Sequence, residues 1–274
     1  MLHLTPTNSF SHTSFQKFAQ DVKDLQSTTS SLHEHHHPAE LVDLALQALQ
    51  RAKIEIVEWR SLLYRRMNVP NLVKDYSYAV PDEVFEEAST ILEGLGLPIT
   101  PPSKFLKAVY GDLCNKGRFH RITKTKLPSG IQNIVIYPLS FTTLDPSEMT
   151  LEQPNHMQPS RCGPILVPRP SAVYASLVRM IVRCPQYSRI RTSLQSELSE
   201  LIGYHLLRLE DGYVNPEDEE ACEDVGIDQR IATAVSLVRQ WSCGREWRKD
   251  EEWIGDALVA IIEGCDIGCL PYSI

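Results

Sequence analysis

The stretch that decides the fold covers residues 72–82 and reads LVKDYSYAVPD. Its β-branched and aromatic residues predict a β-strand over residues 73–80. Asp82 is a preferred N-cap residue, and the apolar positions after it recur at helical spacing up to Gly96, a typical helix stop. The stretch therefore predicts a strand that leads directly into a helix, with the carboxylate of Asp75 near the start of the strand.

The composition indicates an intracellular globular protein. The chain has 274 residues, of which 42% are hydrophobic and 23% charged, as is usual for globular proteins. No apolar run approaches the roughly 20 residues that span a bilayer, and the N-terminus lacks the pattern of a secretory signal. Seven scattered cysteines without such a signal predict reduced thiols. We therefore expect a cytoplasmic or nuclear protein that has no contact with membranes.

The charge of the chain is negative and unevenly distributed. A net charge of −8 argues against an extended nucleic-acid surface, because the phosphate backbone would be repelled. Basic residues concentrate in residues 116–126 and acidic residues in 210–228. A local basic surface and a local acidic segment are therefore expected.

The N-terminal part is expected to form an extension followed by an α/β core. Residues 1–37 contain one helix candidate, which begins at the capping-box pattern Thr13-x-x-Gln16, and a histidine-rich linker at 33–37 that could bind a transition metal. The core, residues 38–141, starts with an amphipathic helix from Pro38 to about residue 53. A short strand at 54–57 and a helix that ends near Met67 follow.

The remaining elements are expected in a fixed order. Ser103 caps a helix, and strands at 118–125 and 131–137 form a hairpin. Residues 142–163 form a long loop, and residues 164–274 are mainly helical. The helices are expected near 171–183, 193–208, 228–242 and 250–263, with start signals at Thr192, Asp228 and Asp250 and a stop at Gly264.

This order of elements resembles the nucleotidyltransferase superfamily, an α+β fold with a small mixed sheet flanked by helices and a helical C-terminal part. In that family a strand ends in a Gly-Gly or Gly-Ser turn, and a later strand carries Asp-x-Asp. A third carboxylate lies on a further strand, and the carboxylates hold divalent metals on the nucleotide phosphates. The segments at 166–174 and 210–214 are also similar to those of uncharacterised fungal proteins distantly related to this superfamily.

The resemblance places the remnant motif at three positions. Glu58-Trp59 stands where the family has its glycines, and Asp75-Tyr76-Ser77 stands where it has Asp-x-Asp. The strand at 132–137, where the third carboxylate would fall, contains no acidic residue. Asp75 and Ser77 alone would make a weak metal site, because a neutral hydroxyl is a weak ligand for the strongly hydrated Mg²⁺ ion. The alternative is a structural Asp75, held at the strand end by a hydrogen bond or by an ion pair with Lys74 or an arginine.

Three functions are consistent with these features. The first is a catalytically inactive member of the fold, a pseudoenzyme that binds a nucleotide, another ligand or a protein and has no assigned cofactor. The second is an active transferase whose Mg²⁺ ligands are Asp75 and Glu58. The third is a scaffold that binds a basic partner through the acidic segment at 210–228. The departures at all three motif positions favour the first.

Other polar residues have competing interpretations. Lys116, Arg118 and Arg121 could bind phosphate, or could form the charged surface of an edge strand. Cys114 and His120 suggest a nucleophile and a base, but packing is the interpretation we favour. His205 is expected to be a core histidine.

Overall fold

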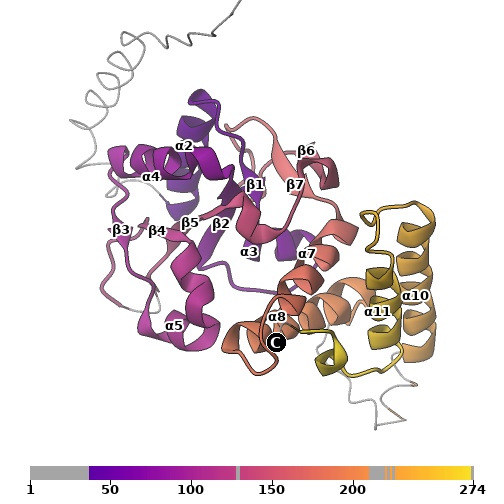
Figure 1. Ribbon diagram of the computed structural model, residues 1–274. Coiled ribbons are helices and arrows are strands. Elements are labelled where there is room, and N and C mark those ends of the chain that lie inside the picture. Colours follow the sequence, from indigo (N-terminus) through magenta and orange to yellow (C-terminus); the bar gives the residue numbers. More distant parts are fainter. Residues whose placement is uncertain (1–36, 128–129, 210–219, 221–222, 224–225, 273–274) are drawn as a thin grey trace, which may run out of the picture.

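A computed structural model describes residues 37–127, 130–209, 220, 223 and 226–272. The fold is mixed α/β, with 53% helix and 13% strand and a single seven-stranded mixed sheet between helices (Figure 1). The predicted N-terminal helix, the histidines before residue 37 and most of the acidic segment at 210–228 lie outside the described residues. Within the part of the chain that the structure describes, no helix is both long and apolar enough to cross a membrane.

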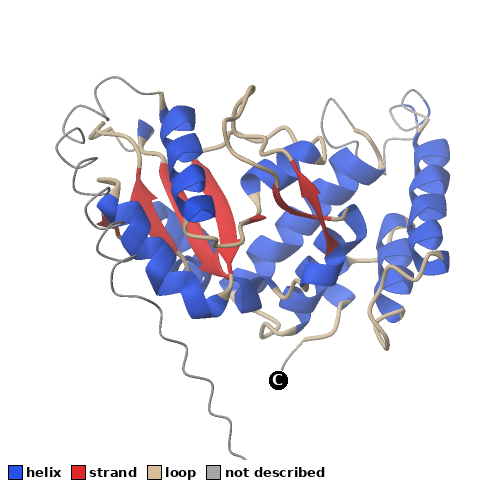
Figure 2. Cartoon of the chain, turned by 90° about the horizontal axis from the view of Figure 1, so that it is seen from above, coloured by secondary structure: helices blue, strands red, loops and turns tan. Residues whose placement is uncertain are grey.

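The sheet is built around β2 and β5, which pair in parallel along six residues each. The strands are β1 (Val57–Glu58), β2 (Asp75–Val80), β3 (Ile99–Thr100), β4 (Arg118–Arg121), β5 (Asn133–Pro138), β6 (Met149–Glu152) and β7 (Ile165–Pro168). Their order across the sheet is β3-β4-β5-β2-β1-β7-β6. The two central strands are almost fully buried because helices cover both faces of the sheet, as Figure 2 shows.

Helices lie on both sides of the sheet, and two further helices near the C-terminus pack against each other beyond it (Figure 1 and Figure 2). They are α2 (Pro38–Arg51), α3 (Ser61–Arg66), α4 (Phe85–Gly94), α5 (Lys104–Tyr110), α6 (Leu139–Thr142), α7 (Pro170–Val182), α8 (Arg189–Leu201), α10 (Ile227–Cys243) and α11 (Trp253–Ile262). Shorter turns cover Asp82–Val84, Gly111–Lys116, Pro146–Glu148 and Ile267–Cys269, and a π-helical turn, Ile202–Leu206, continues α8. In Figure 1, α2 and α4 lie on one side of the sheet, and α3, α5 and α8 on the other.

Several start and stop signals act as the sequence predicts. Pro38 is at the first turn of α2, and Ser103 Oγ accepts a hydrogen bond from Leu106 N at the start of α5. Gly96, just after α4, has a φ of 78°, and Gly264, after α11, has a φ of 106°. Both values lie in the left-handed region that favours glycine, so these residues end their helices as expected.

Other start signals were wrong. Asp82 does not cap the helix that follows it; its carboxylate accepts a hydrogen bond of 2.9 Å from Ser140 N instead, at the first turn of α6. The residue before α8 is Ser188, rather than Thr192. The helices α10 and α11 begin after Gly226 and Glu252, so Asp228 and Asp250 are not their caps.

The predicted loop at 142–163 and the helical region after it contain two strands that the sequence analysis missed. β6 pairs with β7 in antiparallel fashion, and β7 pairs in parallel with β1. The sheet therefore extends to Pro168, beyond the boundary predicted at residue 141. The buried hydrophobic residues likewise form one cluster, from Leu41 in α2 to Leu270 near the C-terminus. The C-terminal helices share the core of the sheet.

A buried charge network joins the edge of this sheet to the C-terminal helices. Glu148, just before β6, accepts hydrogen bonds from Arg179 in α7 at 2.8 Å and from Arg248 at 2.6 Å. Arg179 also bonds Glu251, and the side chains of Glu148 and Arg179 are 4% and 6% exposed. Burial alone would raise the pKa of Glu148, but the two arginines outweigh it and lower the pKa.

We predict that Glu148→Ala lowers the free energy of unfolding by about 3 kcal/mol, because it leaves the buried guanidinium of Arg179 short of one carboxylate. The measurement is equilibrium denaturation in urea. The matched control is Glu86→Ala, which removes an exposed ion pair with Arg118 and should cost less than about 1 kcal/mol. Equal losses in the two variants would contradict a special role for the buried network.

Candidate functional site

The remnant motif lies on β2, where alternate side chains point to opposite faces of the sheet. Asp75, Ser77 and Ala79 share one face, and Tyr76 and Tyr78 share the other. On the neighbouring strand β5, Asn133 is the partner of Asp75 in the register. We call the face that carries Asp75 the Asp75 face.

Asp75 is held by a neutral partner. Its Oδ1 accepts a hydrogen bond of 2.8 Å from Asn133 Nδ2. Burial raises the pKa of Asp75, and the Asn133 hydrogen bond and the positive charges of Arg60 and Lys74 oppose this only in part. Ser77 is buried, with 3% of its surface exposed. Asp75 therefore has the environment of a packed strand-end carboxylate.

Glu58 points to the opposite face. It is the antiparallel partner of Tyr78, so its side chain shares the face of Tyr78 and not that of Asp75. The Glu58 carboxylate is fully buried and accepts two hydrogen bonds from Arg66, at 2.5 and 3.2 Å. Burial raises the pKa of Glu58, with Arg66 opposing the shift. The structure thus does not bring Glu58 together with Asp75 and Ser77.

Arg60, which was not predicted from the sequence, is the charged residue that lowers the pKa of Asp75 most. Its φ of 56° lies in the left-handed region, at the turn between β1 and α3, directly after Glu58-Trp59, where the resemblance places the family's glycines. The Arg60 guanidinium is buried against the Glu197 carboxylate of α8 and lies 4.6 Å from the ring centre of Tyr110. Tyr64 in α3 also donates a 2.7 Å hydrogen bond to Glu197. The charge of Arg60 acts on Asp75 and on Tyr137, the β5 partner of Ala79, so the arginine side chain and its salt bridge lie on the Asp75 face.

The basic residues predicted to bind phosphate do not converge. Arg118 and Arg121 are three apart on β4, so they point to opposite faces of the sheet. Arg118 pairs with Glu86, and Arg121 donates hydrogen bonds to the carbonyl groups of Thr123 and Thr125. Lys116 lies before the strand, in the turn that ends at it. The charged surface of a strand near the sheet edge describes these residues better than a phosphate site.

The other reactive side chains make separate packing contacts. His120 uses both ring nitrogens, with Nε2 3.1 Å from Ser89 Oγ and Nδ1 3.0 Å from the Leu97 carbonyl oxygen. Cys114 donates to the carbonyl of Leu106 rather than to His120. His205 Nδ1 lies 3.1 Å from the Tyr174 hydroxyl, and burial lowers the pKa of His205 to about 4. These contacts agree with the packing roles expected for them.

No family model, curated protein or solved structure matches the chain. The resemblance to nucleotidyltransferases therefore stays a prediction from the sequence.

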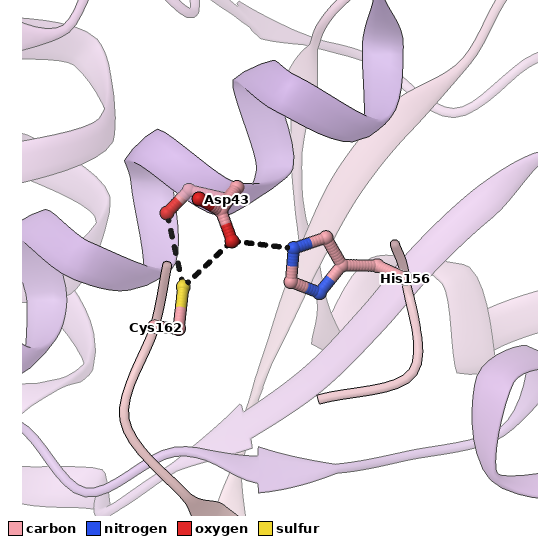
Figure 3. A group of neighbouring side chains, drawn as sticks. All are labelled: Asp43, His156 and Cys162. Atoms are coloured by element: carbon pink, nitrogen blue, oxygen red, sulfur yellow. Dashed lines mark hydrogen bonds and ion pairs between the residues drawn. The ribbon is translucent and has the colours of Figure 1, made fainter. Parts of the chain in front are cut away.

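A second polar cluster, on the side of the sheet covered by α2, was not predicted. Figure 3 shows Asp43 of α2 facing His156 and Cys162 of the loop between β6 and β7. Asp43 Oδ1 lies 3.0 Å from His156 Nε2 and 3.2 Å from Cys162 Sγ. It also accepts hydrogen bonds from Ser160 Oγ at 2.7 Å and from Arg161 N at 3.2 Å. We call Asp43, His156 and Cys162 the Asp43 cluster.

The cluster is buried, and the pKa values of its three groups differ from their ordinary values. Burial would raise the pKa of Asp43, but the hydrogen bonds from Ser160, Cys162 and His156 hold it well below its usual range. Burial raises the pKa of the Cys162 thiol to about 12 and lowers the pKa of His156. Cys162 is therefore a neutral thiol that faces a carboxylate, which is unsuited to nucleophilic catalysis.

A cavity of about 1010 Å³ adjoins the cluster. Its lining consists of one residue of α3, the last residue of β6 and the loop between β6 and β7, namely Arg66, Glu152, Gln153, Pro154, Asn155, Met157, Gln158, Pro159, Ser160 and Cys162. Apart from Arg66 and Glu152 the lining is uncharged, and the two charged side chains are paired with each other at 3.2 Å. The cavity therefore presents amides, a hydroxyl, a thiol and a thioether.

A signal for the cluster was present in the sequence, although a weak one. Asp43 interrupts the buried residues of α2, between Val42 and Leu46, and a carboxylate on a buried face needs a partner. Nothing in the sequence shows that the partner lies more than 100 residues away, in a proline-rich loop.

We predict that Arg66→Met lowers the free energy of unfolding by about 3 kcal/mol, because it leaves Glu58 buried and unpaired. The double variant Glu58→Gln/Arg66→Met should recover part of this loss, since the buried charge is then gone. Urea denaturation of the two single variants and the double variant gives the coupling energy. Additive losses would show that the two side chains do not act as a pair.

We predict that Asp75→Asn is as stable as the wild type or more stable at pH 7, whereas Asp75→Ala loses about 1 kcal/mol because Asn133 loses its acceptor. The raised pKa of Asp75 means that the folded state binds a proton more tightly than the unfolded state. As the pH falls through the raised pKa, the free energy of unfolding of the wild type therefore rises relative to that of Asp75→Asn. The difference between the two levels off below about pH 4, the ordinary pKa of aspartate. Denaturation curves from pH 7 to pH 4 measure this, and a gap that widens toward acid would contradict it.

Proposed function

We propose that this chain is a binding protein with a nucleotidyltransferase-like fold and no transferase activity. One observation carries the proposal: Glu58 and Asp75, the two carboxylates of the remnant motif, point to opposite faces of the sheet. Two-metal phosphoryl chemistry needs carboxylates that converge on ions about 4 Å apart. Asp75 and Glu58 cannot meet that requirement across a sheet.

The other features of the Asp75 face support the same proposal. The guanidinium of Arg60 and its salt bridge to Glu197 lie there, directly after the Glu58-Trp59 turn at which the family's glycines let the backbone approach the nucleotide phosphates. Asn133 on β5 is the partner of Asp75 and has an amide side chain, whereas the family has its third carboxylate on the corresponding later strand. The active-transferase alternative therefore lacks converging ligands among the described residues. The scaffold alternative depends on the segment at 210–228, most of which lies outside them.

We propose that the ligand occupies the cavity beside the loop at 153–162. Arg66, the guanidinium at its edge, is already engaged by Glu58, Glu152 and the carbonyl of Gln153, so it offers little to a phosphate group. The remaining polar groups of the lining hydrogen-bond neutral donors and acceptors. This chemistry favours an uncharged polar molecule over a nucleoside triphosphate.

The test compares the four ribonucleosides and a set of neutral sugars with the four ribonucleoside triphosphates, with and without Mg²⁺ or Mn²⁺, by calorimetry and by a transfer assay with labelled nucleotide. We predict no metal-dependent transfer, and binding of neutral probes that is lost in Met157→Trp, which fills the cavity. The matched control is Leu72→Trp, at a side chain 80% exposed elsewhere.

Two results would count against the proposal. Metal-dependent transfer that is lost in Asp75→Ala would restore the active enzyme. Binding of triphosphates alone, unchanged by Met157→Trp, would remove the cavity as the ligand site, and so would the absence of binding by every neutral probe.

A further inference from the structure

The Asp43 cluster brings three different metal-ligating groups to one point. Asp43 comes from α2, and His156 and Cys162 come from a loop more than 100 residues later. One ligand atom of each lies within 4.8 Å of the other two, and all three residues are buried. Among the described residues this is the one such group of three.

We propose that Asp43, His156 and Cys162 bind a zinc ion, with the fourth position open toward the adjoining cavity. This proposal is independent of the proposed binding function. Thiolate, imidazole and carboxylate together form a ligand set that zinc accepts, whereas Mg²⁺ and Ca²⁺ require oxygen ligands.

The spacing of the three groups is close to what zinc needs. Zinc bond lengths in a tetrahedral site place neighbouring ligand atoms about 3.3 to 3.7 Å apart. The distances of 3.0 Å from Asp43 Oδ1 to His156 Nε2 and 3.2 Å to Cys162 Sγ are a few tenths of an ångström shorter. A small outward movement of the loop would therefore admit the ion.

The contacts of Asp43 Oδ1 also favour a cation. Four groups converge on this one oxygen: His156 Nε2, Ser160 Oγ, Arg161 N and Cys162 Sγ. A carboxylate oxygen has about two lone-pair positions, so it cannot serve four donors well. With zinc bound, the imidazole and the thiolate would coordinate the ion, and Ser160 and Arg161 would stay as the outer hydrogen bonds that orient the carboxylate.

The protons and charges of the site can be assigned group by group. The Cys162 thiol would release its proton to solvent, Asp43 would remain ionised, and His156 would carry its proton on Nδ1, a buried atom that has no hydrogen-bond partner in the described part of the chain. The two negative ligands then neutralise the two charges of the ion, and the positive charge of Arg161, whose Nε lies 3.3 Å from Asp43 Oδ2, stays on a side chain that is 60% exposed. Cys162 and Ser160 line the cavity, so a water molecule there can complete the tetrahedron.

The experiment uses the full-length, untagged protein with His33→Ala, His35→Ala and His36→Ala, because the histidine-rich segment could bind metal by itself. His37 is kept, since it caps α2. After removal of metal with a chelator, the protein is titrated with Co²⁺ and then with Zn²⁺. We expect the near-ultraviolet charge-transfer band of a cobalt thiolate, its loss when Zn²⁺ displaces cobalt, and a rise in melting temperature with Zn²⁺.

The variants identify the ligands. Cys162→Ser should lose the charge-transfer band, while Cys114→Ser, at a second buried thiol outside the cluster, should keep it. Asp43→Asn should weaken zinc binding by more than about 100-fold, which exceeds the loss that outer-sphere partners alone cause. Circular dichroism checks that each variant is folded.

The opposite results would overturn the proposal. If the starting protein shows neither a thiolate band nor a zinc-dependent melting temperature, the cluster is a hydrogen-bonded clamp only. This readout needs no cluster variant, so it holds even if Asp43→Asn fails to fold. A band that survives in Cys162→Ser but disappears in Cys265→Ser or Cys269→Ser would assign the metal to the exposed C-terminal cysteines instead.

Discussion

The alternation of side chains along β2 is the constraint on which the rest of the structure depends. Because neighbouring residues of a strand face opposite ways, one six-residue strand separates the chain's carboxylates into two environments. Asp75 faces Asn133 and the side of Arg60, whereas Glu58, through its pairing with Tyr78, faces the other side with Arg66. Each environment then satisfies its own carboxylate. The two faces are chemically independent, which is why proximity in the sheet does not create a shared metal site.

The same separation explains why polar groups so different in kind occur within one domain. On the Asp75 face, the buried charges are held by a salt bridge between Arg60 and Glu197, and the turn that carries Arg60 has a backbone conformation unusual for arginine. On the other side, Asp43 holds a loop against α2 and leaves a cavity beside it. The salt bridge fills the space beside Asp75, whereas the loop leaves a cavity beside Asp43. A ligand therefore has more room beside Asp43 than beside Asp75.

The elements that could be predicted from the sequence are those with long periodic patterns or local signals. The helix from Pro38, the cap at Ser103 and the strand around Asp75 depend on neighbouring residues, so local physics decides them. The strands β6 and β7 have four residues each, and their pairing partners are distant, so their patterns were too short to interpret. Asp82 has the side chain of an N-cap residue, but its carboxylate accepts a hydrogen bond from Ser140 N in α6 and not from the helix that follows it in sequence. The Asp43 cluster was not predicted for the same reason, since its side chains meet only after the chain has folded.

The sequence separation of these contacts has a consequence for the order in which the protein folds. Glu58 finds Arg66 eight residues later, so this pair can form as soon as α3 does. The contact of Arg60 with Glu197 spans 137 residues, and the contact of Asp43 with Cys162 spans 119 residues. Contacts of such separation form slowly, because closing long stretches of chain costs entropy before any contact repays it. During synthesis on the ribosome, α2 therefore emerges with an Asp43 carboxylate that has only Gln47 of the same helix as a partner, and the guanidinium of Arg60 emerges long before Glu197.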